Sequence, residues 1–271
     1  MGGGMIPNVL SIAGSDPSGG AGIQADLKAI SANGGYGMAA ITGLTAQNTR
    51  GVRGVELVSP AFIRAQIAAV FDDIRVDAVK IGMLGTADII AAVAAELAPR
   101  GVPVVVDPVM VAKGGDRLLA AEAVAALREV LVPLATVLTP NLPEAADLLG
   151  EGEAADQAGM ARQAAALLAL GPGAVFLKGG HLAGEESADL FLSADRAEWV
   201  AAPRIATKNT HGTGCTLSAA LAAQLALGRD APAAARAAKA YTLGAIRGAD
   251  RLTVGQGHGP TDHFFAMRTT E

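Results

Sequence analysis

Residues 211–215, with the sequence HGTGC, place the single cysteine of this 271-residue chain directly after a Gly-Thr-Gly run. Leucines at positions 217, 221 and 225 follow at helical spacing and predict a helix from about residue 213 to 227. The first N–H groups of a helix have no partners within it and carry its positive dipole end. We expect the amides of Gly212, Thr213 and Gly214 to surround a phosphoryl group during its transfer, because glycine leaves backbone groups accessible.

Cys215 itself has two interpretations at this stage. It can pack at the helix start as a small apolar residue. Alternatively, the helix dipole lowers its pKa from the ordinary value of about 8.5 and produces partial thiolate. A lone cysteine cannot form an intrachain disulfide, so we expect a reducing, cytoplasmic environment.

Charged side chains follow other apolar runs of the chain. Asp107 and Glu144 are candidate ligands for Mg²⁺, which prefers a few carboxylates together with water and phosphate oxygens. Either residue could instead cap a helix or a loop. Lys178 ends an apolar run, where it can neutralise nucleotide phosphates or extend along the edge into solvent.

The elements that would hold these residues alternate along the chain. Short β-branched runs predict strands at 8–14, 37–43, 76–82, 102–108, 135–140 and 173–180. Alanine-rich amphipathic segments predict helices at 60–74, 86–97, 121–131, 213–227 and 231–248. The alternation predicts an α/β fold with a largely parallel central sheet covered by helices on both faces.

Three further segments complete the predicted organisation. Residues 188–202 predict an antiparallel hairpin, whereas residues 44–51 and 150–159 are interpreted as connections. With no linker and no repeat, we expect one domain over residues 1–271. Ligands of such sheets sit at the carboxyl ends of the strands, where the polar and glycine residues of this chain gather.

Composition and the search for two nucleotide-binding motifs argue against several classes of function. The apolar fraction of 51% can supply a core, while 3% aromatic residues and a net charge of −5 argue against nucleic-acid binding. The uncharged runs are too short for a membrane span, and no targeting signal is evident. GAGIQA at 20–25 fits a dinucleotide fingerprint loosely but lacks the acidic residue after the second strand, and no Walker phosphate loop is present. The glycine cluster either faces a ligand or shapes a turn for packing.

A series of stretches then occurs in order from about residue 9 to 224: IAGSDPSGGAGIQADLKA, GLTAQNTRGV, KIGMLG, VVDPVM, TPNLPEA, KGGH and TKNTHGTGCTLSAA. This series resembles the ribokinase-like superfamily and, within it, the bacterial hydroxymethylpyrimidine and phosphomethylpyrimidine kinases of thiamin biosynthesis. The resemblance implies a ribokinase-like three-layer fold with a small antiparallel hairpin. It also implies an ATP- and Mg²⁺-dependent homodimer that phosphorylates the hydroxymethylpyrimidine and its monophosphate.

The resemblance carries residue roles onto this chain. Most superfamily members have an aspartate where Cys215 stands, and the cysteine, characteristic of the pyrimidine kinases and some pyridoxal kinases, is implied to be the base toward the substrate hydroxyl. Gln47, whose amide offers both a donor and an acceptor, is implied to contact the aminopyrimidine edge. Asp26 and Gly14 map to further pyrimidine contacts. Met83 maps to an apolar wall, although core packing would also explain a methionine there.

The remaining implied roles concern the nucleotide. NLPE matches the superfamily pattern N-x-x-E and so includes Asn141 at the ATP site with Glu144. Thr210 and Lys239 are expected to help hold ATP. His181 and His211 receive no chemical role, because isolated histidines more often cap or pack. A pyridoxal kinase of the same subfamily, a cysteine-dependent hydrolase or transferase, and an inactive nucleotide-binding protein remain as alternatives.

Overall fold

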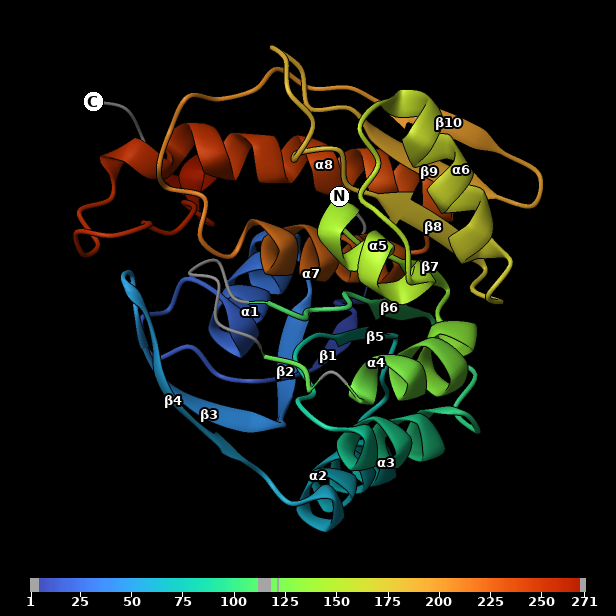
Figure 1. The fold of residues 1–271 in the computed structure, drawn as a ribbon. Coiled ribbons are helices and arrows are strands. Elements are labelled where there is room, and N and C mark those ends of the chain that lie inside the picture. Colours follow the sequence, from blue (N-terminus) through green and yellow to red (C-terminus); the bar gives the residue numbers. More distant parts are fainter. Residues whose placement is uncertain (1–4, 112–117, 121, 269–271) are drawn as a thin grey trace.

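The computed structural model describes residues 5–111, 118–120 and 122–268 (Figure 1). Within these ranges the chain forms an eight-stranded sheet in the order β10-β9-β8-β7-β6-β5-β1-β2. The strands from β2 to β8 in this order pair in parallel, and β9 and β10 are antiparallel at one edge. The strands are β1 (Asn8–Ala13), β2 (Tyr36–Ile41), β5 (Ala78–Ile81), β6 (Val104–Val106), β7 (Val137–Leu138), β8 (Ala174–Leu177), β9 (Asp189–Ser193) and β10 (Ala197–Val200).

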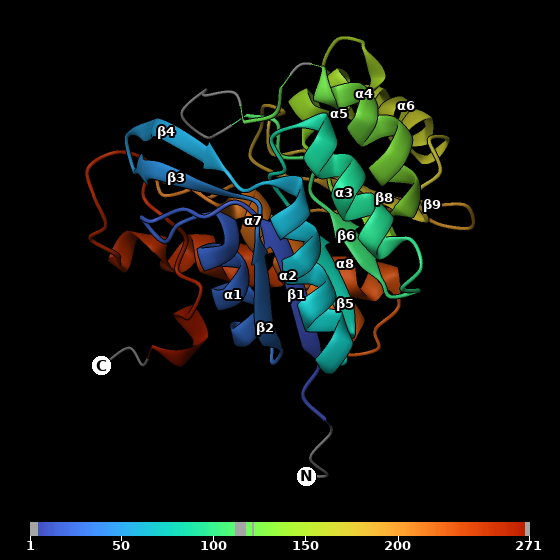
Figure 2. The same ribbon diagram turned by 90° about the horizontal axis from the view of Figure 1, so that it is seen from below.

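Helices cover both faces of the sheet, so the predicted three-layer α/β fold is confirmed (Figures 1 and 2). One face carries α1 (Gly22–Ala32), α7 (Thr213–Ala226) and α8 (Ala231–Gly248). The other carries α2 (Pro60–Asp73), α3 (Ala87–Leu97), α4 (Ala123–Ala126), α5 (Leu142–Leu149) and α6 (Gln157–Leu168), with a π-helical turn (Leu127–Leu131) and a 3₁₀ turn (Val132–Leu134) extending α4. Two more 3₁₀ turns, Ala249–Arg251 and Phe265–Met267, follow α8. Across the described ranges, no helix combines the length and the apolar character that a membrane crossing needs.

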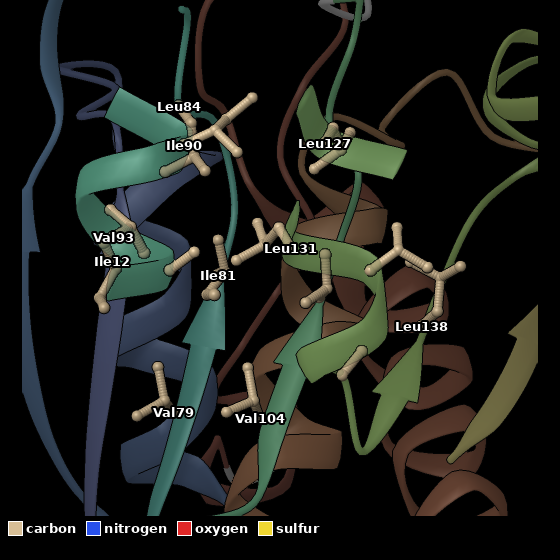
Figure 3. Close-up of a cluster of buried hydrophobic side chains, with 14 of the residues drawn as sticks. Ile12, Val79, Ile81, Leu84, Ile90, Val93, Val104, Leu127, Leu131 and Leu138 are labelled. Atoms are coloured by element: carbon tan, nitrogen blue, oxygen red, sulfur yellow. The ribbon is translucent and has the colours of Figure 1, made fainter. Parts of the chain in front are cut away.

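The two apolar layers follow from alternation along the buried strands. In β6, Val105 packs into the cluster beneath α1, α7 and α8, whereas Val104 and Val106 pack into the cluster on the opposite face. Figure 3 shows part of that second cluster, where Ile90 and Val93 of α3 lie over strand residues such as Ile81. A strand buried on both faces reads as a continuous apolar run, which is why residues 102–108 (VPVVVDP) predict a strand.

The hairpins differ in part from the sequence prediction. The hairpin predicted at 188–202 is confirmed as β9 and β10, but it extends the central sheet. A second antiparallel pair, β3 (Gly43–Asn48) and β4 (Gly51–Leu57), forms a separate two-stranded sheet that projects from the body (Figures 1 and 2). The interpretation of residues 44–51 as a connection was therefore wrong. These strands are exposed over much of their length and shift register at Ala46/Gln47, so they lack a clean apolar alternation. The assignment of residues 1–271 to one domain stays a prediction.

Candidate active site

A cavity of about 760 Å³ lies at the carboxyl ends of the parallel strands. The order in which strands are added to the sheet reverses between β1 and β5, because β2 lies on one side of β1 and the parallel strand β5 on the other. Crevices form at such switch points in open α/β sheets. The loops after β1, β5, β6, β7 and β8, the hairpin β3–β4 and the start of α7 supply the walls. The lining includes Gly14, Gln47, Met83, Asp107, Asn141, Glu144, Lys178, Thr210, Gly212, Thr213, Gly214, Cys215 and Lys239.

The start of α7 is built by close backbone packing. Gly212 precedes the helix with φ of 76°, in the left-handed region, and no side chain caps the helix. A Cβ atom on Gly212 would lie 1.8 Å from the carbonyl oxygen of Gly20, so only glycine fits at this position. The Thr213 N–H donates to the Thr210 carbonyl at 3.3 Å, and the Thr213 hydroxyl donates to the same oxygen at 2.7 Å. No side chain caps this end of α7, and residues 212–215 line the cavity, so the helix start has the character of an anion site although the Thr213 N–H is already paired.

Cys215 lies in the first turn of α7 on the cavity wall. Part of the residue remains exposed, yet burial of the thiol among protein atoms raises its pKa to about 11. Lys80 and the Gly22 N–H act in the opposite direction, and Asp26 and Asp107 add to the rise. The expectation that the helix dipole lowers the thiol pKa was wrong, because removing the sulfur from water penalises the thiolate more than these partners stabilise it.

Three residues assigned to the pyrimidine line the cavity. A Cβ atom on Gly14 would lie 3.0 Å from Sδ of Met83, so the two residues form a close apolar wall. Gln47 extends from the hairpin strand β3, where its Oε1 accepts from the Thr45 hydroxyl at 3.2 Å. These positions suit a flat heterocycle with an edge of donors and acceptors.

Asp26 is placed differently from the other three. It is completely buried in α1 and is absent from the cavity lining described by the structure. Its carboxylate instead accepts from Lys80 Nζ at 2.8 and 2.9 Å and from the Ser11 hydroxyl at 2.6 Å. Among the described residues, the Asp26 carboxylate therefore contacts Lys80 and Ser11 and does not line the cavity.

Sequence reasoning missed an acidic partner of His211. His211 Nε2 lies 2.7 Å from Asp16 Oδ2 and 3.4 Å from Gln47 Nε2, and both Asp16 and His211 are buried. Burial opposes ionisation of Asp16, but hydrogen bonds from His211 and Ser18 hold its pKa below the ordinary value. Asp16 and His211 are 195 positions apart, so the only local signal was an aspartate opening the glycine cluster.

Asp107, Glu144 and Lys178 form a charged cluster on the cavity wall. Lys178 Nζ lies 2.9 Å from Asp107 Oδ1 and 3.8 Å from Glu144 Oε2. Burial works to lower the pKa of Lys178, but the two carboxylates raise it above its ordinary value and keep the lysine charged. Burial raises the pKa of Glu144 to about 7, against the pull of Lys178. Two carboxyl groups thus share one lysine, so the cluster has fewer positive than negative groups.

The capping interpretation of Glu144 also holds in the structure. Asn141 caps α5 by accepting from the Glu144 N–H at 2.8 Å, and Glu144 Oε2 accepts from the Asn141 N–H at 2.8 Å. Further along the cavity, Lys239 Nζ lies 2.7 Å from Asp189 Oδ2 and 3.3 Å from the Ser187 hydroxyl. These contacts fix Asn141 and Lys239 at the wall.

The donor set suits a metal ion bound mainly through a nucleotide. Among the described residues, no group of three or more His, Cys, Asp or Glu side chains could hold an ion alone. Mg²⁺ needs only one or two protein carboxylates when phosphates and water supply its other ligands. Asp107 and Glu144 fit that arrangement, because the two carboxyl groups have only the one positive charge of Lys178 beside them in this cluster.

Comparison with known proteins decides the family. Residues 16–262 match the family model described as phosphomethylpyrimidine kinase. The chain is also 58% identical over 260 residues to a hydroxymethylpyrimidine/phosphomethylpyrimidine kinase of Rhizobium meliloti, covering 96% of this chain and 98% of that protein. The chain belongs to the phosphomethylpyrimidine kinase family.

Solved structures carry the same fold. A phosphomethylpyrimidine kinase from Clostridium difficile 630 is 44% identical with a TM-score of 0.79, covering 89% of this chain and 99% of that one. A pyridoxal kinase of Bacillus subtilis, solved as an ADP complex, is 41% identical with a TM-score of 0.90, covering 98% and 100%. This phosphomethylpyrimidine kinase family member therefore shares its architecture with kinases named for two different ring alcohols.

Proposed function

We propose that this chain transfers the γ-phosphoryl group of ATP to 4-amino-5-hydroxymethyl-2-methylpyrimidine and then to the monophosphate, in thiamin biosynthesis. The observation that carries the proposal is one cavity lined by the uncapped start of α7, by the apolar wall of Gly14 and Met83, and by a cluster of charged groups. Gly14, Gln47 and Met83 would hold the ring, and Asn141, Lys178, Thr210 and Lys239 would hold the nucleotide.

The chemistry divides between positioning and charge stabilisation. The amides of residues 212–215 would stabilise the charge that spreads over the moving phosphoryl group. Cys215 would accept the proton of the hydroxymethyl group while its oxygen bonds to phosphorus and the bond to ADP breaks. Because the acceptor of the second reaction is already a phosphate, a base should matter less in that step.

A magnesium ion would be held by Glu144 and Asp107, directly or through water, and would neutralise charge on the nucleotide phosphates when bound. Lys178, bonded to Asp107, would lie beside those phosphates. The homodimer and the cytoplasmic location also belong to this proposal, and light scattering of the purified protein tests the first.

A coupled ATP-consumption assay tests the function by offering the hydroxymethylpyrimidine, its monophosphate and pyridoxal separately to the purified chain. We expect turnover of both pyrimidines, with the diphosphate as the final product. Turnover of pyridoxal alone would overturn the proposal in favour of a pyridoxal kinase. Mass spectrometry of the products separates one phosphorylation from two.

A further inference from the structure

The glycine-rich loop after β1 surrounds a buried carboxylate to which the proposed reaction gives no role. Asp16 Oδ1 accepts from the Ser18 N–H at 2.9 Å and from the Ser18 hydroxyl at 2.7 Å, and Oδ2 accepts from the Ala21 N–H at 2.8 Å. Burial works to raise the pKa of Asp16, but its hydrogen bonds hold that pKa below the ordinary value. The loop amides that could bind a phosphate therefore bind an anion of the chain itself.

A further donor to Asp16 is the ring of His211. An ionised carboxylate can only accept, so His211 Nε2, which lies 2.7 Å from Asp16 Oδ2, must carry a proton. Glycine makes room for this ring, because a Cβ atom on Gly20 would lie 2.5 Å from its Cδ2. The His211 backbone N–H also donates to the Gly259 carbonyl at 3.0 Å. Ring and backbone of His211 are thus both fixed, directly before Gly212.

The protonated nitrogen of His211 restricts how the Gln47 carboxamide can lie. Gln47 Nε2 lies 3.4 Å from His211 Nε2, so two N–H donors face each other in this orientation. Thr45 has one hydroxyl proton, and the Ser15 carbonyl at 2.9 Å competes for it with Gln47 Oε1 at 3.2 Å. A half-turn of the carboxamide exchanges its oxygen and nitrogen, and both contacts then pair a donor with an acceptor.

We propose that His211, fixed by Asp16, is a positioning residue that turns the Gln47 oxygen toward itself and so determines which way round the acceptor ring binds. The inference rests on the proposed function. Gln47 then offers an acceptor on the side of His211 and a donor on the side of Thr45.

This order of groups matches the proposed substrate. In the hydroxymethylpyrimidine, the carbon bearing the amino group lies between a ring nitrogen and the carbon bearing the hydroxymethyl group. The amino group would donate to Gln47 on the side of His211, and the ring nitrogen would accept on the other side. The hydroxymethyl group then lies beyond the amino group, toward residues 212–215, which follow His211 in the chain. The opposite carboxamide orientation would direct the hydroxymethyl group away from α7.

The first test observes the His211 ring in the purified wild-type chain. Long-range proton–nitrogen NMR, with the ring signals assigned through the backbone, shows which ring nitrogen carries a proton. We expect a proton on Nε2 of His211 at neutral pH. An Nε2 without a proton would overturn the proposal, because Gln47 could then donate to it. This measurement needs neither a variant nor a substrate.

The second test measures the preference for the amino edge. An analogue with a 4-oxo group in place of the 4-amino group offers an acceptor beside a ring N–H, which reverses the pattern. His211→Leu should reduce the preference for the amino compound over this analogue, taken as the ratio of the two kcat/KM values, by about tenfold and mainly through KM. His211→Gln, whose amide can donate to both Asp16 and Gln47, should retain most of the preference.

His263→Leu is the matched control. His263 is also a buried histidine, with Nε2 3.0 Å from the Thr216 hydroxyl, but it is not among the residues that line the cavity. Its replacement should leave the preference unchanged, even where urea unfolding shows lost stability. An unchanged preference in His211→Leu, or an equal fall in both leucine variants, would overturn the role of His211. A wild-type chain inactive on the hydroxymethylpyrimidine and its monophosphate would refute the proposed function, while the NMR result would still decide the orientation of Gln47.

Discussion

Replacing Gly212 by alanine should strongly reduce phosphoryl transfer to both acceptors, because this glycine sets the geometry of the α7 start. Its φ of 76° is one that L side chains rarely adopt, and the left-handed conformation alone costs about 1–2 kcal/mol for alanine. The larger effect is steric. The new Cβ would lie 1.8 Å from the Gly20 carbonyl oxygen and 3.1 Å from Cα of Ala21, both backbone atoms that cannot rotate away.

The magnitude follows from the movement needed to relieve this overlap. Real Cβ atoms almost never approach closer than 3.0 Å, so the 212–215 loop must move by about 1 Å relative to residues 20–22. A displacement of about 1 Å in a catalytic arrangement can reduce turnover roughly 100-fold. We expect a loss of that order on the hydroxymethylpyrimidine and on its monophosphate alike, since both reactions use the same amides.

The same helix supplies a matched control at its other end. Gly228 follows α7 with φ of 83°, and a Cβ there would meet nothing within 4 Å. Gly228→Ala should therefore cost only the conformational strain of about 1–2 kcal/mol and leave turnover unchanged. Initial rates of ATP consumption and urea unfolding of both variants make the comparison. If Gly212→Ala retained turnover within about threefold of Gly228→Ala, the α7 amides would not be the transfer site.

Three further predictions concern single side chains. Cys215→Ala should reduce turnover of the hydroxymethylpyrimidine steeply and leave ATP affinity almost unchanged. In the wild type, turnover of the hydroxymethylpyrimidine should rise about tenfold per pH unit below the thiol pKa of about 11. A flat pH profile would contradict the role of Cys215 as base. Gln47→Ala should raise KM for the pyrimidine while ATP affinity, measured by calorimetry, persists; an unchanged KM would remove Gln47 from the substrate contacts. The pKa of Glu144 is about 7 when folded, above its ordinary 4.5, so the folded state binds more protons between these values and stability falls as pH rises through them. Urea unfolding at about pH 5 and about pH 7.5 compares the wild type with Glu144→Gln. Relative to this variant, the free energy of unfolding of the wild type should fall by at most about 1.4 kcal/mol per pH unit. If the free energies of both proteins changed equally with pH, the raised pKa of Glu144 would be contradicted.

Several features were accessible from the sequence because they depend on neighbouring residues. The strands β1, β6 and β8 are buried on both faces and therefore read as apolar runs, and the start of α7 is marked by glycines before a leucine stripe. The hairpin β3–β4 escaped prediction because its exposed strands impose no apolar pattern on the chain.

The amino-acid sequence by itself determined the alternation of strands and helices outside β3–β4, the sheet edge that carries the site and the glycine-led helix start at Cys215. Only the tertiary structure decided which charges meet: Lys178 with Asp107, 71 positions away, His211 with Asp16, and Lys80 with Asp26. It also reversed the expected shift of the Cys215 pKa. The physical reason is that burial and ion pairing are set by segments distant in the chain, whereas helical and strand periodicity is set within a few residues.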